Sequence, residues 1–242
     1  MRKLLFVLYQ PYKWLFFIPV SFLITFFWGT GAVIFSYFLK PAVVSKIFGV
    51  SWAQIILFLT PVKTKIYGRN NIQKNKSYVI IANHSSQYDI LLLYAKLGVD
   101  FKWVMKKELR AIPGLGAACE RMEHIFIDRS TPLGALDTIE KAKKRIVNGT
   151  SVIFFPEGTR SRNGEISSFR RGAFKFAFDL GLPILPVTIS GTYNVLPPKS
   201  WNVRPGTISL HIHPPIDISD YSWKEADILI NNAKNIILSP LS

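Results

Sequence analysis

The sequence predicts an α/β domain with a mostly parallel central sheet covered by helices, preceded by an N-terminal two-helix membrane anchor. Two observations predict this fold class. Residues 14–39 carry no charge and are dense in aromatic side chains, whereas after Pro61 short apolar runs alternate with helical segments. We therefore place an anchoring segment at residues 1–61 and the α/β domain at residues 62–242.

The first apolar run is long enough to cross a bilayer. As a helix, residues 14–39 would extend about 39 Å, against a hydrocarbon core of about 30 Å. We expect Pro19 and the Gly29-Thr30-Gly31 group to interrupt this helix. The second run, Ile47 to Leu59, would reach only about 20 Å, which is too short to cross alone.

Basic residues flank the anchoring segment, so the positive-inside rule predicts both of its ends on the cytoplasmic side. Lys40 and Lys46 lie between the two runs, and a spanning hairpin would leave both at the far surface. We therefore favour two helices inserted into one leaflet, with a spanning hairpin as the close alternative. The run of aromatics without a polar face disfavours a buried core hairpin, and its length disfavours a cleaved signal peptide. The flanking basic residues are Arg2, Lys3, Lys13, Lys63 and Lys65.

The rest of the chain alternates between strand-like and helix-like segments. This alternation favours parallel strands, with the last strands antiparallel, and in such sheets binding sites lie beyond the carboxyl ends of the strands. The expected strands are Tyr78 to Ala82, Phe101 to Met105, Ile125 to Asp128, Ser151 to Phe155, Ile184 to Ser190 and Thr207 to His213. The expected helices are Ile90 to Leu97, Leu133 to Val147, Ala173 to Leu180 and Trp223 to Ile237.

A formal net charge of +15 calls for an anionic partner. The apolar anchor favours an acidic membrane surface, and the lack of any nucleic-acid motif argues against nucleic acid. The single cysteine, Cys119, excludes an intrachain disulfide and indicates a reducing compartment. We expect Cys119 to be a small buried hydrophobe.

A histidine and an aspartate, His84 and Asp89, follow the apolar run that ends at Ala82. Residues five apart point about 140° from each other on an ideal helix, so the pair must meet across a loop-to-helix turn. An imidazole can accept a proton from a hydroxyl while a carboxylate holds its tautomer. No Gly-x-Ser-x-Gly elbow occurs, which predicts that the hydroxyl belongs to a substrate. The alternative is a capping aspartate with a structural histidine.

Three basic residues, Lys106, Arg129 and Arg160, follow successive expected strands in the same way as His84. Guanidinium groups bind phosphate with a planar fork and lysine binds it as a point charge, so this shared placement predicts an anion pocket. Each of them alone would be read as a solvated surface charge. Glu157 lies in a stiff turn, where it could orient a substrate hydroxyl, brace Arg160 or be structural. Gly158 permits a close approach of the backbone to a ligand.

Four blocks of the sequence resemble the glycerolipid acyltransferase family, in the family's order and spacing, between Tyr78 and Thr192. The segment that begins at Lys106 also resembles a basic segment of many members. One departure is Glu123, where many members have glycine. The four blocks are Asn83-His84-Ser85-Ser86-Gln87-Tyr88-Asp89, Phe126-Ile127-Asp128-Arg129, Phe155-Pro156-Glu157-Gly158-Thr159-Arg160-Ser161 and Leu185-Pro186-Val187.

The resemblance implies that His84 is the general base for the sn-2 hydroxyl of 1-acylglycerol 3-phosphate and that Asp89 orients it. The hydroxyl would attack the thioester of acyl-CoA or acyl carrier protein directly and give phosphatidic acid. The implied substrate contacts are Lys106, Arg129, Glu157, Gly158, Thr159 and Arg160.

Three other functions compete with this one: an acyltransferase for glycerol 3-phosphate or another lysophospholipid, a hydrolase, and a non-catalytic module that binds anionic lipid. The absence of a nucleophile elbow weighs against the hydrolase. No cofactor or metal is expected, because the remaining histidines lack the company of a metal site. These histidines are His124, His211 and His213.

Overall fold

A computed structural model of the chain describes residues 2–112, 114–127, 142, 145–146 and 149–241. Seven strands within these residues form one sheet in the order β1-β7-β6-β2-β5-β3-β4. From β6 to β4 neighbouring strands are parallel, whereas β7 is antiparallel to β6 and β1 is parallel to β7. The strands are β1 (Val62–Tyr67), β2 (Val79–Ala82), β3 (Phe101–Lys106), β4 (Ile125–Ile127), β5 (Ser151–Phe154), β6 (Ile184–Ser190) and β7 (Gly206–Ile212).

All six expected strands are present, and the mostly parallel sheet with an antiparallel last strand is confirmed. Asp128, the last residue of the third expected strand, lies outside the described residues. The edge strand β1 was not predicted. Its exposed lysines, Lys63 and Lys65, alternate with half-buried residues, which is the pattern of an edge strand with one covered face.

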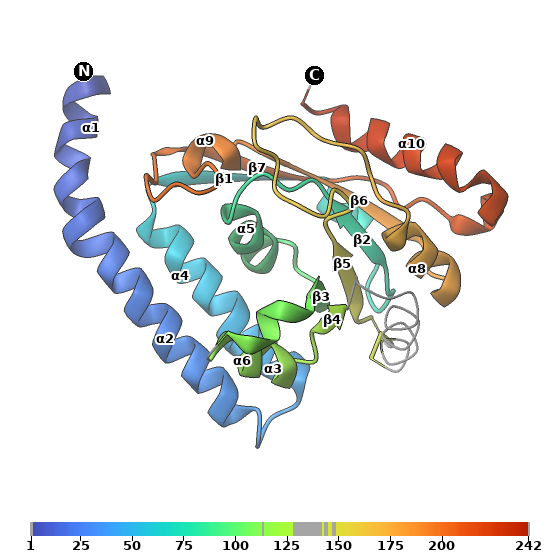
Figure 1. Cartoon of the computed structure of the whole chain (residues 1–242), viewed down its shortest axis with the longest axis horizontal. Helices are drawn as coiled ribbons and strands as arrows, with labels where there is room; N and C mark the ends of the chain where they lie inside the picture. The colour runs from blue at the N-terminus through green and yellow to red at the C-terminus, as the bar shows by residue number, and fades with distance from the viewer. Residues whose placement is uncertain (1, 113, 128–141, 143–144, 147–148, 242) are drawn as a thin grey trace.

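Alternate residues of the central strands pack against different helices, as the pleat of a strand requires. In β2, Ile80 and Ala82 belong to a core shared with α4 (Ser51–Leu59) and α5 (Tyr88–Lys96). Val79 and Ile81 belong to a core shared with α8 (Gly172–Leu180) and α10 (Ala226–Leu238). Figure 1 shows the N-terminal helices on the left and the α8 and α10 pair on the right of the sheet. The expected helical cover on both faces is therefore confirmed.

Three of the four expected helices of the α/β domain correspond to α5, α8 and α10, with ends that differ by at most three residues. The helices α6 (Leu115–Arg121) and α9 (Thr192–Val195) were not predicted. Only residues 142, 145 and 146 of the expected helix Leu133 to Val147 are described. The helical bounds are α1 (Arg2–Pro11), η1 (Tyr12–Phe17), α2 (Ile18–Phe35), α3 (Pro41–Val44), η2 (Ser45–Val50), α4 (Ser51–Leu59), η3 (Arg69–Asn71), α5 (Tyr88–Lys96), η4 (Lys107–Ala111), α6 (Leu115–Arg121), α8 (Gly172–Leu180), α9 (Thr192–Val195), η5 (Ile218–Asp220), η6 (Trp223–Glu225) and α10 (Ala226–Leu238).

The first N-terminal helix is continuous, so the expected interruptions at Pro19 and at the Gly29-Thr30-Gly31 group are wrong (Figure 1). A π-helical turn, η1, precedes Pro19, and the wider turn accommodates the proline ring without a break. Gly31 packs under Phe48 of the second helix, where an added Cβ would lie 2.5 Å from Cε1. Packing between the helices thus outweighs the low helix propensity of glycine.

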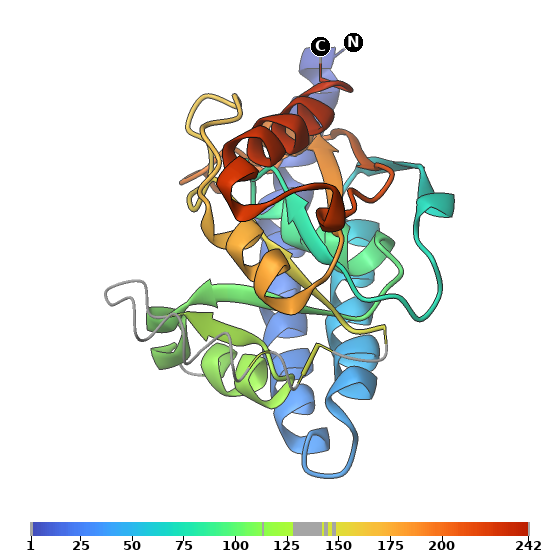
Figure 2. The same cartoon turned by 90° about the vertical axis from the view of Figure 1, so that its right-hand side faces the viewer.

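The second N-terminal helix runs from Pro41 to Leu59, six residues longer than the expected Ile47 to Leu59 run. Its 19 residues correspond to about 28 Å, so the estimate that it is too short to cross a bilayer is wrong. Together with Phe6–Phe35 it forms a hairpin of two helices long and apolar enough to cross a membrane. The turn of this hairpin projects beyond the sheet in Figure 2.

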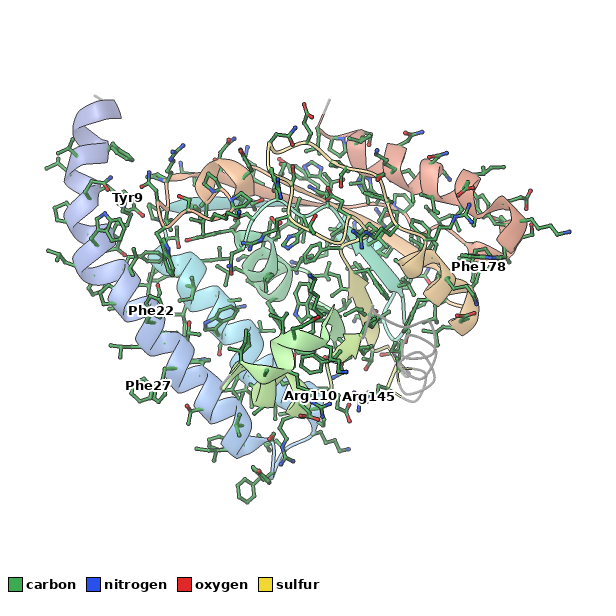
Figure 3. The ribbon with its side chains drawn as sticks, in the orientation of Figure 1. Tyr9, Phe22, Phe27, Arg110, Arg145 and Phe178 are labelled. Atoms are coloured by element: carbon green, nitrogen blue, oxygen red, sulfur yellow. The ribbon has the colours of Figure 1, made fainter. Side chains whose placement is uncertain are left out.

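The outer face of α2 carries large apolar side chains that the chain leaves exposed. Phe26 and Phe27 are exposed by about two thirds, and Figure 3 shows Phe27 on the side of α2 away from the sheet. Exposed apolar patches of this kind mark surfaces that meet a partner or a membrane. The two apolar helices therefore indicate membrane association.

Glu123, between α6 and β4, occupies the left-handed region of backbone space with a φ of 60°. This region favours glycine, because a Cβ crowds the following carbonyl there. The geometry explains why glycine suits this position in the acyltransferases that the sequence resembles. The glutamate keeps the same turn at the cost of some backbone strain.

A buried polar cluster centres on His124 and includes Tyr94 of α5 and Trp103 of β3. Its Nδ1 accepts the Trp103 N–H at 3.3 Å and its Nε2 lies 2.8 Å from the Tyr94 hydroxyl. Burial, with the Lys102 ammonium nearby, lowers the pKa of His124 to about 3. The imidazole is therefore held neutral as a structural group.

We expect His124→Gln to flatten the pH dependence of stability. Between about pH 6.5, the ordinary histidine pKa, and about pH 3, this histidine is protonated in the unfolded chain but neutral in the folded chain. The free energy of unfolding should thus fall as pH decreases through this window, by about 2 kcal/mol at about pH 5. Urea unfolding of both proteins in detergent at about pH 7 and about pH 5 measures the difference. Equal pH slopes in the two proteins would contradict this account.

Candidate active site

The loop between β2 and α5 begins at Asn83, whose side chain holds it to the neighbouring strand β6. The Asn83 amide donates to the Ile189 carbonyl and accepts the Ile189 N–H, each at 2.8 Å. The side chain thus continues the strand pairing past the end of β2. His84 therefore leaves the sheet at a fixed point, at the carboxyl edge of the parallel strands.

The His84 and Asp89 side chains meet across the loop-to-helix turn that the spacing predicted. Nδ1 of His84 lies 2.8 Å from Oδ2 of Asp89, in the first turn of α5. The fully buried carboxylate also accepts the backbone N–H groups of Ser85 at 2.7 Å and Ser86 at 2.8 Å. A carboxylate only accepts, so Nδ1 carries the proton and Nε2 presents a lone pair. Among the described residues, Nε2 has no hydrogen-bond partner.

The face of the His84 ring lies flat on Phe155, with centroids 3.8 Å apart and planes 8° apart. Phe155 in turn stacks on Trp103 of β3 at 5.6 Å. The carboxylate fixes one edge of the imidazole and the stack fixes its face. With 14% of its side chain exposed, His84 stays reachable from outside while its orientation is set.

The buried carboxylate of Glu157 joins His84 to Ser167, which lies ten residues after Glu157. Oε1 accepts the His84 N–H at 2.8 Å, and Oε2 accepts the N–H and hydroxyl of Ser167 at 2.9 and 3.1 Å. The N–H of Ser161 closes the same loop by donating to the His84 carbonyl at 2.8 Å. Both peptide groups of His84 are therefore held by the segment that follows β5. No bond joins Glu157 to Arg160 within the described residues.

The turn after Glu157 depends on Gly158, which has a φ of +78° and closes the turn through its N–H to the Phe155 carbonyl. A Cβ at this position would lie 2.9 Å from the guanidinium carbon of Arg170. The glycine thus permits both the left-handed backbone and the close packing of Arg170. Thr159 is exposed at the tip of the turn.

The structure describes two of the three predicted basic residues, and these two lie in different places. Arg160 is half-buried and lines an apolar groove beside the His84 loop. Lys106 is the exposed last residue of β3, paired in register with Ile127 of β4, and does not line that groove. Arg129 lies outside the described residues. The shared carboxyl edge of the sheet is confirmed for His84, Lys106 and Glu157, whose roles stay predictions.

Several contacts around His84 were missed by reasoning from the sequence. The Ser85 hydroxyl lies 3.1 Å from the hydroxyl of Thr192, and the Ser86 hydroxyl donates to the Leu196 carbonyl at 2.7 Å. Thr192 follows a tight turn at Gly191, where an added Cβ would lie 2.1 Å from the Thr207 carbonyl oxygen of β7. These contacts tie the His84 loop to the chain after β6. No local sequence pattern indicated them, because Thr192 and Leu196 lie 107 and 110 positions after Ser85 and Ser86.

The described residues contain no group of three or more His, Cys, Asp or Glu side chains that could hold a metal ion. His211 and His213 of the β7 region bond to serine and threonine hydroxyls instead. Cys119 is buried, and burial raises its pKa to about 12. Its thiol is therefore not a nucleophile at neutral pH.

Comparison with known proteins places this site in a family. A family model described as Acyltransferase matches residues 63–190, more than half of the chain. The chain belongs to the acyltransferase family. All four sequence blocks fall within the matched residues, so the resemblance inferred from them is confirmed.

Relatives of this acyltransferase carry a common name. This chain is 34% identical to the chloroplastic 1-acyl-sn-glycerol-3-phosphate acyltransferase BAT2 of Brassica napus, over 79% of this chain and 54% of that protein. It is 32% identical to a 1-acyl-sn-glycerol-3-phosphate acyltransferase of Borreliella burgdorferi over 78% and 75% of the two chains. The chain spans about half the length of the chloroplastic relatives.

The fold also matches a solved structure over nearly its whole length. The crystal structure of the 1-acyl-sn-glycerophosphate (LPA) acyltransferase PlsC of Thermotoga maritima aligns with a TM-score of 0.76 and 29% identity. The alignment covers 98% of this chain and 95% of that chain, so it includes the N-terminal hairpin as well as the sheet. The predicted fold class, with two apolar helices ahead of a mostly parallel sheet, is confirmed.

Proposed function

We propose that this acyltransferase moves a fatty acyl group from an acyl thioester to the sn-2 hydroxyl of 1-acylglycerol 3-phosphate and so forms phosphatidic acid. The observation that carries the proposal is the 2.8 Å contact between His84 Nδ1 and Asp89 Oδ2. This contact leaves Nε2, with its lone pair, available at the carboxyl edge of the sheet. The names of the relatives supply the substrate class.

The reaction needs one base and one acid, and His84 serves as both. Nε2 removes the proton of the acceptor hydroxyl as its oxygen attacks the thioester carbonyl, and Asp89 stabilises the imidazolium. The tetrahedral intermediate then collapses and breaks the carbon–sulfur bond. The imidazolium returns its proton to the departing thiolate, so the products are an ester and a free thiol.

Direct transfer without an acyl-enzyme agrees with the surroundings of His84. Its neighbours Ser85 and Ser86 direct their hydroxyls to Thr192 and Leu196, and Cys119 is buried. No hydroxyl or thiol of the described residues hydrogen-bonds to Nε2. In this proposal the acceptor therefore supplies the nucleophile.

The remaining substrate contacts are proposed on the same basis. Lys106, Arg129 and Arg160 bind the acceptor phosphate, with Gly158 and Thr159 beside it at the tip of the turn. Because both oxygens of Glu157 bond to the chain, we give it a positioning role through the His84 backbone. Acyl-CoA and acyl carrier protein both remain as donors, since each presents the same thioester.

We further propose that the hairpin inserts into one leaflet of an anionic membrane, with the α/β domain on its cytoplasmic face. The exposed apolar face of α2 and the net charge of +15 support this placement. Holding the site at the interface shortens the path of a lipid acceptor and of a lipid product.

An acyl-transfer assay with 1-acylglycerol 3-phosphate and glycerol 3-phosphate side by side tests the acceptor. The chain in vesicles is supplied with acyl-CoA or acyl carrier protein, and both lipid products and free fatty acid are measured. We expect phosphatidic acid as the main product. A preference for glycerol 3-phosphate would overturn the acceptor, and release of fatty acid without any acceptor would indicate a hydrolase.

A further inference from the structure

The ring of Phe155 covers one face of the His84 imidazole in a geometry that two neutral rings do not prefer. The ring centroids lie 3.8 Å apart and the planes are inclined by only 8°. Neutral aromatic pairs prefer edge-to-face or offset arrangements with centroids about 4.5 to 7 Å apart, because two π faces repel each other. The nearby pair of Phe101 and Trp103 follows this preference, at 5.2 Å and 87°.

A proton on the imidazole changes the sign of this interaction. A cation within about 6 Å of the centroid of an aromatic ring is attracted to its π face, and the attraction is stronger where water is excluded. Only 14% of the His84 side chain is exposed, so little water competes with the ring. The stack on Phe155 therefore favours the imidazolium form of His84 over the neutral imidazole.

The ring of Phe155 is held in place by core residues. Trp103 stacks on Phe155 with centroids 5.6 Å apart and meets Tyr94 edge to face at the same distance. The backbone N–H of Trp103 donates to the buried His124. Phe155 is thus fixed against His84 before any substrate binds, and a preorganised group needs no rearrangement when charge develops.

The charged side chains on the segments that pack against His84 are Asp89, Glu157 and Arg160. The Asp89 carboxylate lies 2.8 Å from Nδ1, at the edge of the ring. Glu157 accepts the backbone N–H of His84, and Arg160 belongs to the turn that follows. Because Asp89 acts on the edge of the imidazole and Phe155 on its face, their effects can be tested separately.

His84 is neutral before Nε2 takes the proton of the acceptor hydroxyl and positive afterwards, until the proton passes to the departing thiolate. We propose that Phe155 is a positioning residue whose π face stabilises this transient imidazolium and so speeds proton transfer. This inference rests on the proposed function. An interaction that strengthens as the transition state forms raises kcat, whereas one that is equal in both states changes only binding.

Fluorinated phenylalanines at position 155 test the proposal. Each fluorine atom withdraws electron density from the π face and changes the size of the ring little. We expect kcat to fall stepwise with one, two and three fluorine atoms, by about tenfold in total, equivalent to about 1.4 kcal/mol. KM for both substrates should stay the same, because the ring acts through His84. The acidic limb of the pH profile of kcat/KM should move to lower pH, because a less stabilised imidazolium loses its proton at lower pH.

Phe154 is the matched control, since it precedes Phe155 and lies on the opposite side of β5. It is buried against Phe176 of α8, with ring centroids 5.2 Å apart. The same fluorinated residues at position 154 should leave kcat and the pH profile unchanged. Equal losses at both positions would mean that fluorine disturbs the fold, and constant kcat in the position 155 series would mean that Phe155 only packs. Either result would overturn the proposal.

A second measurement does not depend on acyl transfer. NMR of the chain in detergent can follow the ring signals of its four histidines as pH is varied, and His84→Ala identifies the signal of His84. The midpoint of that titration should move to lower pH with each fluorine atom at position 155 and should not move with fluorine at position 154. An unmoved midpoint would overturn the inference in an active enzyme as in an inactive one. If the midpoint moves but the unsubstituted chain transfers no acyl group, the proposed function fails and the stabilisation of the imidazolium stands.

Discussion

Replacing His84 with alanine is expected to abolish acyl transfer while the protein still binds vesicles. The substitution removes the imidazole that we propose takes the proton of the acceptor hydroxyl, and a general base contributes about 10²- to 10⁴-fold to a rate. The apolar hairpin is untouched, so its membrane affinity should persist. Initial rates with lysophosphatidic acid and acyl-CoA, together with vesicle sedimentation, measure the two properties on one preparation.

His211→Ala is the matched control for this experiment. His211 lies on β7 and stacks on Tyr67 with ring centroids 4.4 Å apart, away from the His84 loop. It should retain the full rate of transfer. Unchanged transfer by His84→Ala would discard the mechanism and favour a module that only binds lipid. A parallel loss of vesicle binding would point to misfolding instead.

Asp89→Asn should lower the turnover number by about a thousandfold, the order expected when an imidazolium loses its carboxylate partner. An asparagine oxygen can still accept the N–H groups of Ser85 and Ser86, so the loop should keep its shape. KM for both substrates should change little, because Asp89 is fully buried and acts through His84. Steady-state kinetics with each substrate varied in turn separate the two parameters.

The control for Asp89→Asn is Asp179→Asn, which removes a carboxylate paired with Lys175 on the surface of α8. Exposed pairs of this kind contribute little, so its kinetics should match those of the unsubstituted chain. A normal turnover number for Asp89→Asn would show that the carboxylate merely caps α5. A large rise in KM would assign it to binding.

The sequence predicted most of the sheet because its central strands are buried on both faces. Val79 to Ala82 is a continuous apolar run, and Ile184 to Ile189 is interrupted only by the buried Thr188, so both runs leave little choice of structure. The edge strand β1 was not predicted, because only one of its faces is covered and half of its residues are polar. The helix break expected at Pro19 failed because a π-helical turn accommodates the ring. The break expected at Gly29 to Gly31 failed because the packing of Gly31 against the second helix is not visible in a single run of residues.

The site was predictable where one block of sequence contained it and unpredictable where several segments met. His84 and Asp89 share one loop, so their spacing indicated the contact between them. Phe155 under the imidazole, and Ser167 on Glu157, depend on the path of a segment more than 70 positions further along the chain. The groove lined by Arg160 joins residues from five separate segments, and no local pattern in the sequence indicates that they meet.

The hydrogen bonds that hold both peptide groups of His84 bear on when a newly made chain becomes active. β2 lies between β5 and β6, which are both translated later, and Glu157 and Ser161 arrive with the first of them. A nascent chain that has emerged only as far as α6 contains His84 and Asp89 but not the segment that positions them. A partly synthesised chain can thus present its apolar hairpin before its site is assembled, and competence begins only when the late strands have joined the sheet.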